Sequence, residues 1–178
     1  MKPKKPLWKQ PGVQITAVLL VIMVVGGIVA ALFLTQLPPD QPIAFPHDRH
    51  VGMGATCLYC HPGAALGPSA GVPGIEKCWG CHQQVQKQSP DLTILAGFVE
   101  RNEAIPWVPV AIQPDFVRFN HKPHVSAGVQ CTDCHGDVPS MTTAEPQKGM
   151  NMGWCLSCHK NTAPEQWTKL SDCATCHY

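Results

Sequence analysis

Five short motifs in this chain each place two cysteines and a histidine close together. Each reads Cys-x-x-Cys-His, and they occupy residues 57–61, 78–82, 131–135, 155–159 and 173–177. The two thiols of such a motif form thioether bonds to the porphyrin edge, and the adjacent His becomes the proximal iron ligand. The motif cysteines are Cys57, Cys60, Cys78, Cys81, Cys131, Cys134, Cys155, Cys158, Cys173 and Cys176. The proximal histidines would be His61, His82, His135, His159 and His177.

Disulfides and zinc are the alternative uses of these cysteines. Ten cysteines can form five disulfides in an oxidising compartment, and paired Cys-x-x-Cys units can bind zinc. Neither alternative explains why a His follows every second cysteine, and the motifs use all ten cysteines of the chain. The sequence therefore predicts five covalently attached haem c groups.

The four remaining histidines are candidates for the distal iron ligands. They are His47, His50, His121 and His124, and they form two pairs with the same spacing. The members of a pair lie three residues apart on one helical turn, so they cannot both reach the same iron face. Each pair should therefore serve two haems. Histidine on both iron faces leaves no vacant site, which suits electron transfer rather than substrate chemistry.

Four distal histidines cannot serve five irons. Methionine is the usual alternative ligand and raises the potential. Met150 and Met152 stand just ahead of the fourth motif, and we expect one of them to ligate the fifth haem. A five-coordinate fifth haem, which would allow catalysis, is the remaining alternative.

An internal repeat with an offset of 74 residues divides the haem-binding part. Phe-x-His-x-x-His followed after six residues by Cys-x-x-Cys-His begins at both Phe45 and Phe119. The halves are expected at about residues 43–88 and 117–178. Between them, Ser89-Pro-Asp and apolar residues at helical spacing predict a linker helix near residues 91–103. Trp107, in the extended segment that follows, is expected either on a porphyrin face or in ordinary packing.

The fold is expected to be mostly α-helical and irregular, with haems forming much of the core. Residues 39–178 provide about 28 residues per haem, which is too few to enclose each one separately. The 18 prolines and 15 glycines favour short helical turns joined by tight loops. We therefore expect a compact multihaem domain at residues 39–178.

The N-terminal part predicts a single membrane anchor. Residues 15–34 carry no charge, and 20 helical residues span about 30 Å, the thickness of the hydrocarbon core. A signal peptide is the alternative, but its apolar region usually has only about 7–15 residues. We expect a basic cytoplasmic tail at residues 1–12 and an uncleaved transmembrane helix at 13–36. Four lysines before the span favour a cytoplasmic N-terminus in the inner membrane and a periplasmic haem domain.

Charge argues against a nucleic-acid partner. Outside the anchor the chain has 9 basic and 12 acidic residues, and the sequence contains no basic stripe. Haem propionates would make the domain more acidic still.

The paired-His pattern ahead of the haem motif resembles the class III multihaem cytochromes c. The N-terminal anchor, the Ile105-Pro-Trp-Val segment, Pro114-Asp-Phe-Val-x-Phe-x-His121 and Met150-Asn-Met-Gly-Trp-Cys155 extend the likeness over nearly the whole chain. In these features the chain resembles the pentahaem subunit of bacterial alternative complex III. The resemblance implies three kinds of partner: integral membrane subunits that oxidise quinol, an iron–sulfur subunit, and a monohaem cytochrome. The sequence lacks the Cys-His-His variant of the simpler class III pattern, which leaves the fifth axial ligand open.

The leading functional hypothesis is an electron relay without catalytic residues of its own. Electrons from quinol oxidised in neighbouring subunits would pass through this chain to a soluble periplasmic acceptor. Two alternatives stand beside it: a stand-alone anchored quinol dehydrogenase, and a multihaem reductase with an open haem site.

Overall fold

The chain forms two compact units, Met1–Leu37 and Pro38–Tyr178. The structure is a computed structural model that describes all residues except 1–7, 9, 35–38, 86–88 and 147–148. The basic-tail lysines Lys2, Lys4, Lys5 and Lys9 lie outside the described residues, as do the last residues of the expected anchor and of the first half.

The first unit contains one long apolar helix, α1 (Pro11–Leu34). Its 24 residues have a mean hydropathy of 3.0 in the most apolar window and no acidic or basic residue in the terminal turns. At about 1.5 Å per residue, α1 is about 36 Å long and exceeds the hydrocarbon core of about 30 Å. The helix is therefore compatible with a membrane anchor, and a signal sequence near the N-terminus can also meet this criterion of length and composition.

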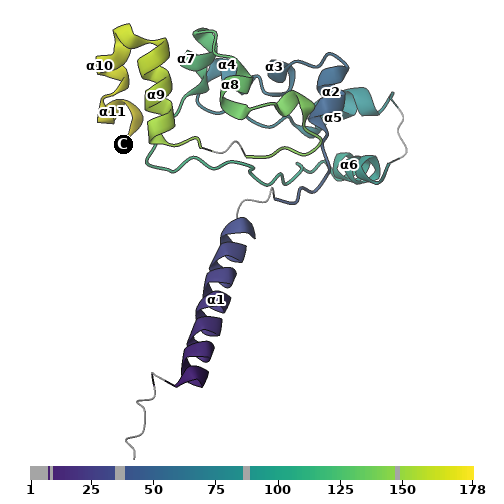
Figure 1. Ribbon diagram of the computed structural model, residues 1–178. Helices are drawn as coiled ribbons and strands as arrows, with labels where there is room; N and C mark the ends of the chain where they lie inside the picture. The colour runs from purple at the N-terminus through teal and green to yellow at the C-terminus, as the bar shows by residue number, and fades with distance from the viewer. Residues whose placement is uncertain (1–7, 9, 35–38, 86–88, 147–148) are drawn as a thin grey trace, which may run out of the picture. The chain divides into compact units, whose positions relative to one another are not determined.

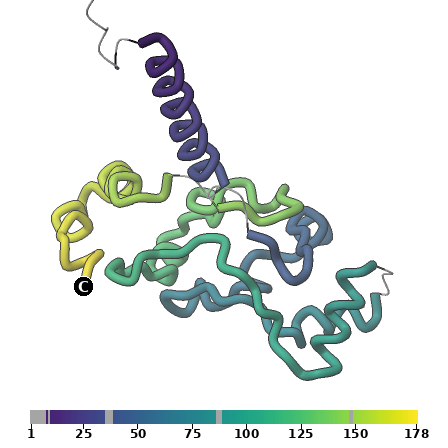
Figure 2. The backbone as a smooth tube through the Cα atoms, turned by 90° about the horizontal axis from the view of Figure 1, so that it is seen from below, coloured from purple at the N-terminus to yellow at the C-terminus, as the bar shows by residue number. Residues whose placement is uncertain are grey.

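The second unit consists of short helices joined by irregular segments (Figure 1). They are α2 (His47–Gly52), α3 (Cys57–Cys60), α4 (Gly63–Leu66), α5 (Ile75–His82), α6 (Pro90–Arg101), α7 (His121–Ser126), α8 (Cys131–His135), η2 (Val138–Ser140), α9 (Met152–Thr162), η3 (Pro164–Gln166), α10 (Trp167–Leu170) and α11 (Cys173–Cys176). Among the described residues, β pairing is confined to an isolated bridge between Val117 and His177. The helix α6 and the C-terminal helices α10 and α11 lie at opposite ends of this unit (Figure 2).

Helix α6 separates the two halves. Ser89 caps its N-terminus, with Oγ accepting a hydrogen bond from the Leu92 amide at 3.3 Å, and Pro90 occupies the first turn. The helix ends at Arg101, two residues before the predicted end, because Asn102 adopts a left-handed conformation with φ of 52°.

The polypeptide itself supplies only a small apolar core. Ile43, Ile75, Leu95 and Ile105 form one buried cluster where α5 and α6 meet. Trp107 packs against this cluster. No described side chain in the whole chain is less than 2% exposed. A unit of this size with so little buried apolar surface needs another source of cohesion, such as a covalent cofactor.

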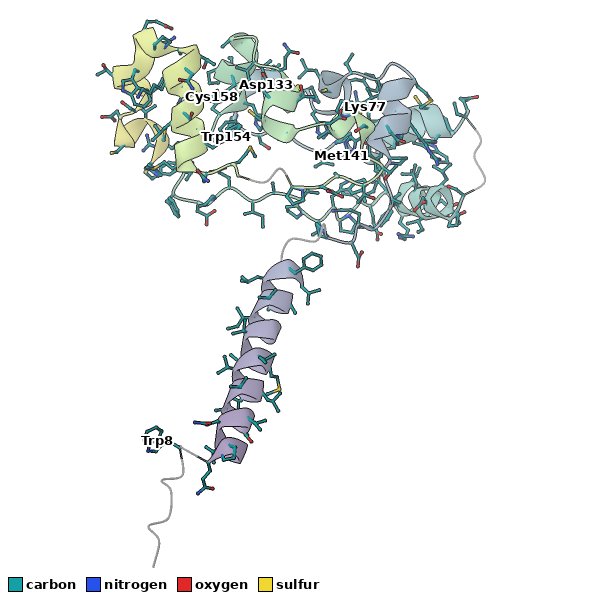
Figure 3. All side chains as sticks on the ribbon, in the orientation of Figure 1. Trp8, Lys77, Asp133, Met141, Trp154 and Cys158 are labelled. Carbon is teal, nitrogen blue, oxygen red and sulfur yellow. The ribbon has the colours of Figure 1, made fainter. Side chains whose placement is uncertain are left out.

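The two halves pack on each other reciprocally. Helix α4 of the first half contacts α7 of the second, and η2 of the second half contacts α2 of the first. The Lys122 amide donates to the Gly67 carbonyl at 3.3 Å, and the Asp48 amide donates to the Met141 carbonyl at 3.1 Å. Both donors and both acceptors are related by the 74-residue offset. Met141, labelled in Figure 3, marks the point where the second half reaches α2.

Candidate functional site

The motif cysteines lie on short helical turns, where i and i+3 positions share one face. The first, second, third and fifth motifs lie on α3, α5, α8 and α11 respectively. The motif at residues 155–159 lies within the longer helix α9. All ten cysteines are free thiols, and no three His, Cys, Asp or Glu side chains converge as a metal-binding group among the described residues. These turns place the two thiols of each motif on one face, as thioether attachment to a haem would require.

A phenylalanine orients each of the two repeated histidine pairs. Phe45 stacks on His50 at a ring-centroid distance of 4.2 Å and meets His47 edge-on at 4.9 Å. Phe119 stacks on His124 at 5.0 Å and meets His121 edge-on at 4.7 Å. The repeat visible in the sequence is thus also a repeat of side-chain geometry.

Three of the four spare histidines lie opposite a motif histidine. The ring centroids are 6.1 Å apart for His50 and His82, 6.2 Å for His121 and His135, and 6.0 Å for His124 and His159. A metal–imidazole bond of about 2.0 Å plus about 1.1 Å from nitrogen to ring centre puts two imidazoles on opposite faces of one iron about 6.2 Å apart. The described side chains therefore fit bis-histidine-ligated haem.

His47 is the fourth spare histidine. Burial lowers its pKa, and the nearby His61 and His50 imidazoles lower it further. Burial likewise lowers the pKa of His135, followed by the influence of His121 and then His61. A lowered pKa keeps the imidazole neutral, which is the form that binds a metal. By the repeat, His47 corresponds to His121, so its proximity to His61 matches that of His121 to His135.

Backbone carbonyls lie within hydrogen-bond distance of Nδ1 in several of these imidazoles. Nδ1 of His50 lies 2.7 Å from the Pro46 oxygen, and Nδ1 of His124 lies 2.8 Å from the Asn120 oxygen. A carbonyl can only accept, so Nδ1 carries the proton and Nε2 is left for a metal. His61 and His121 have carbonyl partners in a different segment, at 2.7 Å each.

The first three motifs are neighbours in a definite order. Burial raises the pKa of Cys78 in the second motif, and the nearby Cys60 thiol of the first motif raises it further. Burial also raises the pKa of Cys131 in the third motif, followed by the neighbouring Cys57 thiol of the first. The first motif therefore lies between the second and the third.

The last three motifs continue this line. Burial raises the pKa of Cys134 in the third motif, followed by the nearby Cys158 thiol of the fourth. Burial and then the Cys176 thiol of the fifth motif raise the pKa of Cys155 in the fourth. The spatial order of the motifs is therefore second, first, third, fourth, fifth, which Figure 1 shows as the succession α5, α3, α8, α9, α11.

The fifth motif has different surroundings. In the part that the structure describes, the ring contact of His177 is with Phe116, at 5.9 Å, and its Nδ1 lies 3.3 Å from the Phe116 oxygen. Met150 and Met152 flank the start of α9 with side chains 39% and 65% exposed. Neither methionine is buried against the fifth motif, so the identity of the fifth distal ligand stays a prediction.

Two features of the site were not predicted from the sequence. One is the set of backbone carbonyls that hold His61 and His121, which come from residues 68–71. The other is the docking of the C-terminus, where the Arg118 amide donates to the Cys176 oxygen at 2.8 Å. Neither has a sequence signal, because the groups involved are main-chain atoms brought together by the fold.

The chain is similar to known multihaem cytochromes. Residues 117–178 match the family model described as "Cytochrome c7 and related cytochrome c". The chain is also 29% identical over 183 residues to "Menaquinone reductase, multiheme cytochrome c subunit" from Nitratidesulfovibrio vulgaris, covering 86% of this chain and 87% of that relative. Residues 117–178 are thus similar to a cytochrome c7-type multihaem domain, and this similarity together with the Cys-x-x-Cys-His motifs implies c-type haem as the cofactor. The described parts of the second unit are helical or irregular.

Proposed function

We propose that this chain is a membrane-anchored pentahaem cytochrome c that carries electrons within a quinone-linked membrane oxidoreductase. The observation that carries the proposal is the set of three histidine pairs whose rings lie 6.0 to 6.2 Å apart. Each pair combines one motif histidine with one histidine of the repeated pairs. This spacing leaves room for an iron between two nitrogens and for no other ligand on the same axis.

The proposed roles of the residues follow from this arrangement. The ten motif cysteines attach five haems, and the five motif histidines bind the irons from the proximal side. His47, His50, His121 and His124 bind from the distal side at the first, second, third and fourth motifs respectively, and Met150 or Met152 serves the fifth. When bound, c-type haem supplies a centre that accepts and releases one electron at a time. The chain contributes attachment, axial ligation and exclusion of other ligands.

The order of the motifs supports a path from one end of the haem domain to the other. The protein holds neighbouring attachment sites close enough for their thiols to influence one another, from the second motif through the first, third and fourth to the fifth. A single line of sites leaves two terminal sites, next to α5 and next to α11. We propose that partners dock at these two ends.

The proposed topology places α1 in the inner membrane, with a cytoplasmic N-terminus and the haem domain in the periplasm. The basic residues before α1 support this orientation. The partners we propose are integral membrane quinol-binding subunits, an iron–sulfur subunit and a monohaem cytochrome, with a soluble periplasmic electron acceptor.

Two directions of electron flow are candidates. The sequence resemblance to alternative complex III favours quinol oxidation, with electrons leaving to the periplasmic acceptor. The relative in Nitratidesulfovibrio vulgaris is named as a subunit of a menaquinone reductase, and this favours transfer toward the quinone. Both share the same role for this chain, which moves electrons and leaves quinone chemistry to a neighbour.

The experiment that tests the role is native electrophoresis of gently solubilised membranes, with haem staining and mass spectrometry of the band. Co-migration with polytopic membrane subunits and an iron–sulfur protein is expected, together with a mass increment of five haems. Purified complex is then assayed with quinol plus oxidised cytochrome and with quinone plus reduced cytochrome, which decides the direction. Migration as a lone cytochrome that itself oxidises quinol would favour a stand-alone quinol dehydrogenase.

Electron paramagnetic resonance addresses the reductase alternative. Bis-histidine and His–Met ligation give low-spin ferric iron, so we expect five low-spin components. A high-spin signal that responds to cyanide or nitrite would favour an open catalytic site at the fifth haem.

A further inference from the structure

The connection after the first motif holds imidazoles from both halves of the haem domain on one short turn. Nδ1 of His61 donates to the Gly71 oxygen at 2.7 Å, and Nδ1 of His121 donates to the Pro68 oxygen at 2.7 Å. His61 belongs to the first motif, whereas His121 lies opposite His135 of the third. These motifs are neighbours at the junction of the halves. One turn, residues 68–71, therefore contacts a ligand at each of the two sites.

Gly63 permits this turn to lie where it does. A Cβ at residue 63 would come within 2.5 Å of the Ser69 oxygen and 2.8 Å of the Ala70 oxygen, both main-chain atoms. Gly71 adopts a φ of +72°, which glycine reaches without strain. The Ser69 Oγ accepts a hydrogen bond from the Gly71 amide at 3.3 Å and closes the turn. The turn thus folds directly against α4. Its Pro68 and Gly71 carbonyls contact the two imidazoles.

The corresponding contact is missing in the other half. The Lys122–Gly67 bond has its repeat-related counterpart in the Asp48–Met141 bond, so the halves dock in the same way. His47 is the counterpart of His121, but its Nδ1 is buried without a hydrogen-bond partner among the described residues. The carbonyl contact to His121 is therefore a property of this turn and not of the repeat.

We propose that the turn formed by residues 68–71 is a positioning element that lowers the reduction potentials of the first and third haem sites and fixes the planes of their axial imidazoles. The proposal rests on the ligand assignment of the proposed function. A hydrogen bond from Nδ1 to a carbonyl fixes ring orientation and makes the imidazole a more basic ligand. A more basic ligand stabilises ferric over ferrous iron, so weakening the bond raises the potential.

The test uses the full-length haem-loaded protein with Gly63→Ala, which forces the turn away from α4. The control is Gly67→Ala, which adds a Cβ in the same connection with no chain atom within 4 Å and an extended backbone. In a spectroelectrochemical titration, two of the five components should shift to higher potential in Gly63→Ala and none in Gly67→Ala.

Ligand planes provide a second readout. The imidazole planes of His121 and His135 lie 12° apart, whereas those of His50 and His82 lie 64° apart. Near-parallel planes give a rhombic low-spin spectrum, and rotation toward perpendicular moves the largest g value upward. Gly63→Ala should move a rhombic component and leave the second-motif component in place. Unchanged potentials and g values in a Gly63→Ala protein that retains its haems would overturn the proposal.

A milder variant covers the case in which Gly63→Ala does not accumulate. Ser69→Ala removes the hydrogen bond to the Gly71 amide and adds no atom, so it should raise the potential of the first site alone. Unchanged potentials in Ser69→Ala would then overturn the proposal. Failure of the underlying ligand assignment would be visible differently, as high-spin iron at these sites in the unaltered protein.

Discussion

The first and second halves of the haem domain contain the same local arrangement of side chains in different surroundings. In both, a phenylalanine stacks on the second histidine of a pair and meets the first one edge-on. In both, Nδ1 of the second histidine donates to the carbonyl four residues earlier. The first histidines differ, because Nδ1 of His121 donates to the Pro68 carbonyl, whereas Nδ1 of His47 has no partner in the part of the chain that the structure describes. Interactions within the repeated unit are conserved between the halves, whereas interactions between the units are free to diverge.

The second half also contains an element without a counterpart. The fifth motif follows η3 and α10, and its His177 packs on Phe116 rather than opposite a histidine. Its tail is held by the Val117–His177 bridge and by Arg118, which lies 4.4 Å over the Tyr178 ring. This addition lengthens the line of motifs at one end only.

Removal of the second histidine of each pair should have the largest effect and should be equivalent in the two halves. His50→Ala and His124→Ala each remove one distal ligand, so each should convert one haem from low spin to high spin. Five haems should still be found by mass, because thioether bonds remain. Electron paramagnetic resonance and intact mass check both statements. Conversion of two haems by one variant would contradict the assignment of one histidine per iron.

Replacement of the methionines near α9 tests the distal ligand of the fifth motif, which only the second half contains. Axial ligand identity moves a haem potential within a range of about 0.8 V, so loss of a methionine ligand should lower or abolish the most positive component. We expect this in either Met150→Leu or Met152→Leu, with the other variant as its control. A potentiometric titration measures it. If neither variant changes any component, methionine is not the fifth ligand.

Replacement of the paired phenylalanines should give moderate and matched effects. Phe45→Leu and Phe119→Leu each remove a stacked and an edge-on ring contact, and aromatic pairs contribute about 0.5–1.5 kcal/mol. The free energy of unfolding should fall by about 1 kcal/mol in both, and the low-spin signals of that half should broaden. Denaturant unfolding followed by haem absorbance measures the loss. A large loss in one half with none in the other would disprove their equivalence.

Substitution of the N-cap residues should have the smallest effect, a loss of stability alone. This loss should differ between the two halves. Asn120 caps α7 by accepting from the Lys122 amide at 3.0 Å, whereas Pro46 at the same position of α2 makes no side-chain cap. Asn120→Ala should cost about 1 kcal/mol of stability without changing any spin state. Pro46→Ala is the matched control and should lose no capping bond. Equal losses in the two variants, measured by denaturant unfolding, would show that the Asn120 cap adds nothing.

Much of the local structure was predictable from residue types and spacing. The absence of charge over residues 15–34 predicted the long apolar helix, and Ser89-Pro-Asp predicted a capped start for α6. The Cys-x-x-Cys-His motifs predicted c-type haem, which the similarity to cytochrome c7 supports. These features depend on contacts within a few residues, so a linear pattern is enough to indicate them. The same holds for the Phe-x-His-x-x-His unit, whose three rings lie within six consecutive residues.

The sequence by itself determined the kind of chemistry, the candidate ligands and the presence of two related halves. The order of the motifs, second–first–third–fourth–fifth, was decided only by the tertiary structure, because the halves dock through α4 with α7 and η2 with α2. The same docking brings the Pro68 carbonyl to His121, 53 residues away in the chain. Main-chain carbonyls have no residue-specific signature, so a contact of this kind is absent from any sequence pattern. Gly63 lets the turn at residues 68–71 fold against α4, the helix of the first half that contacts α7 of the second.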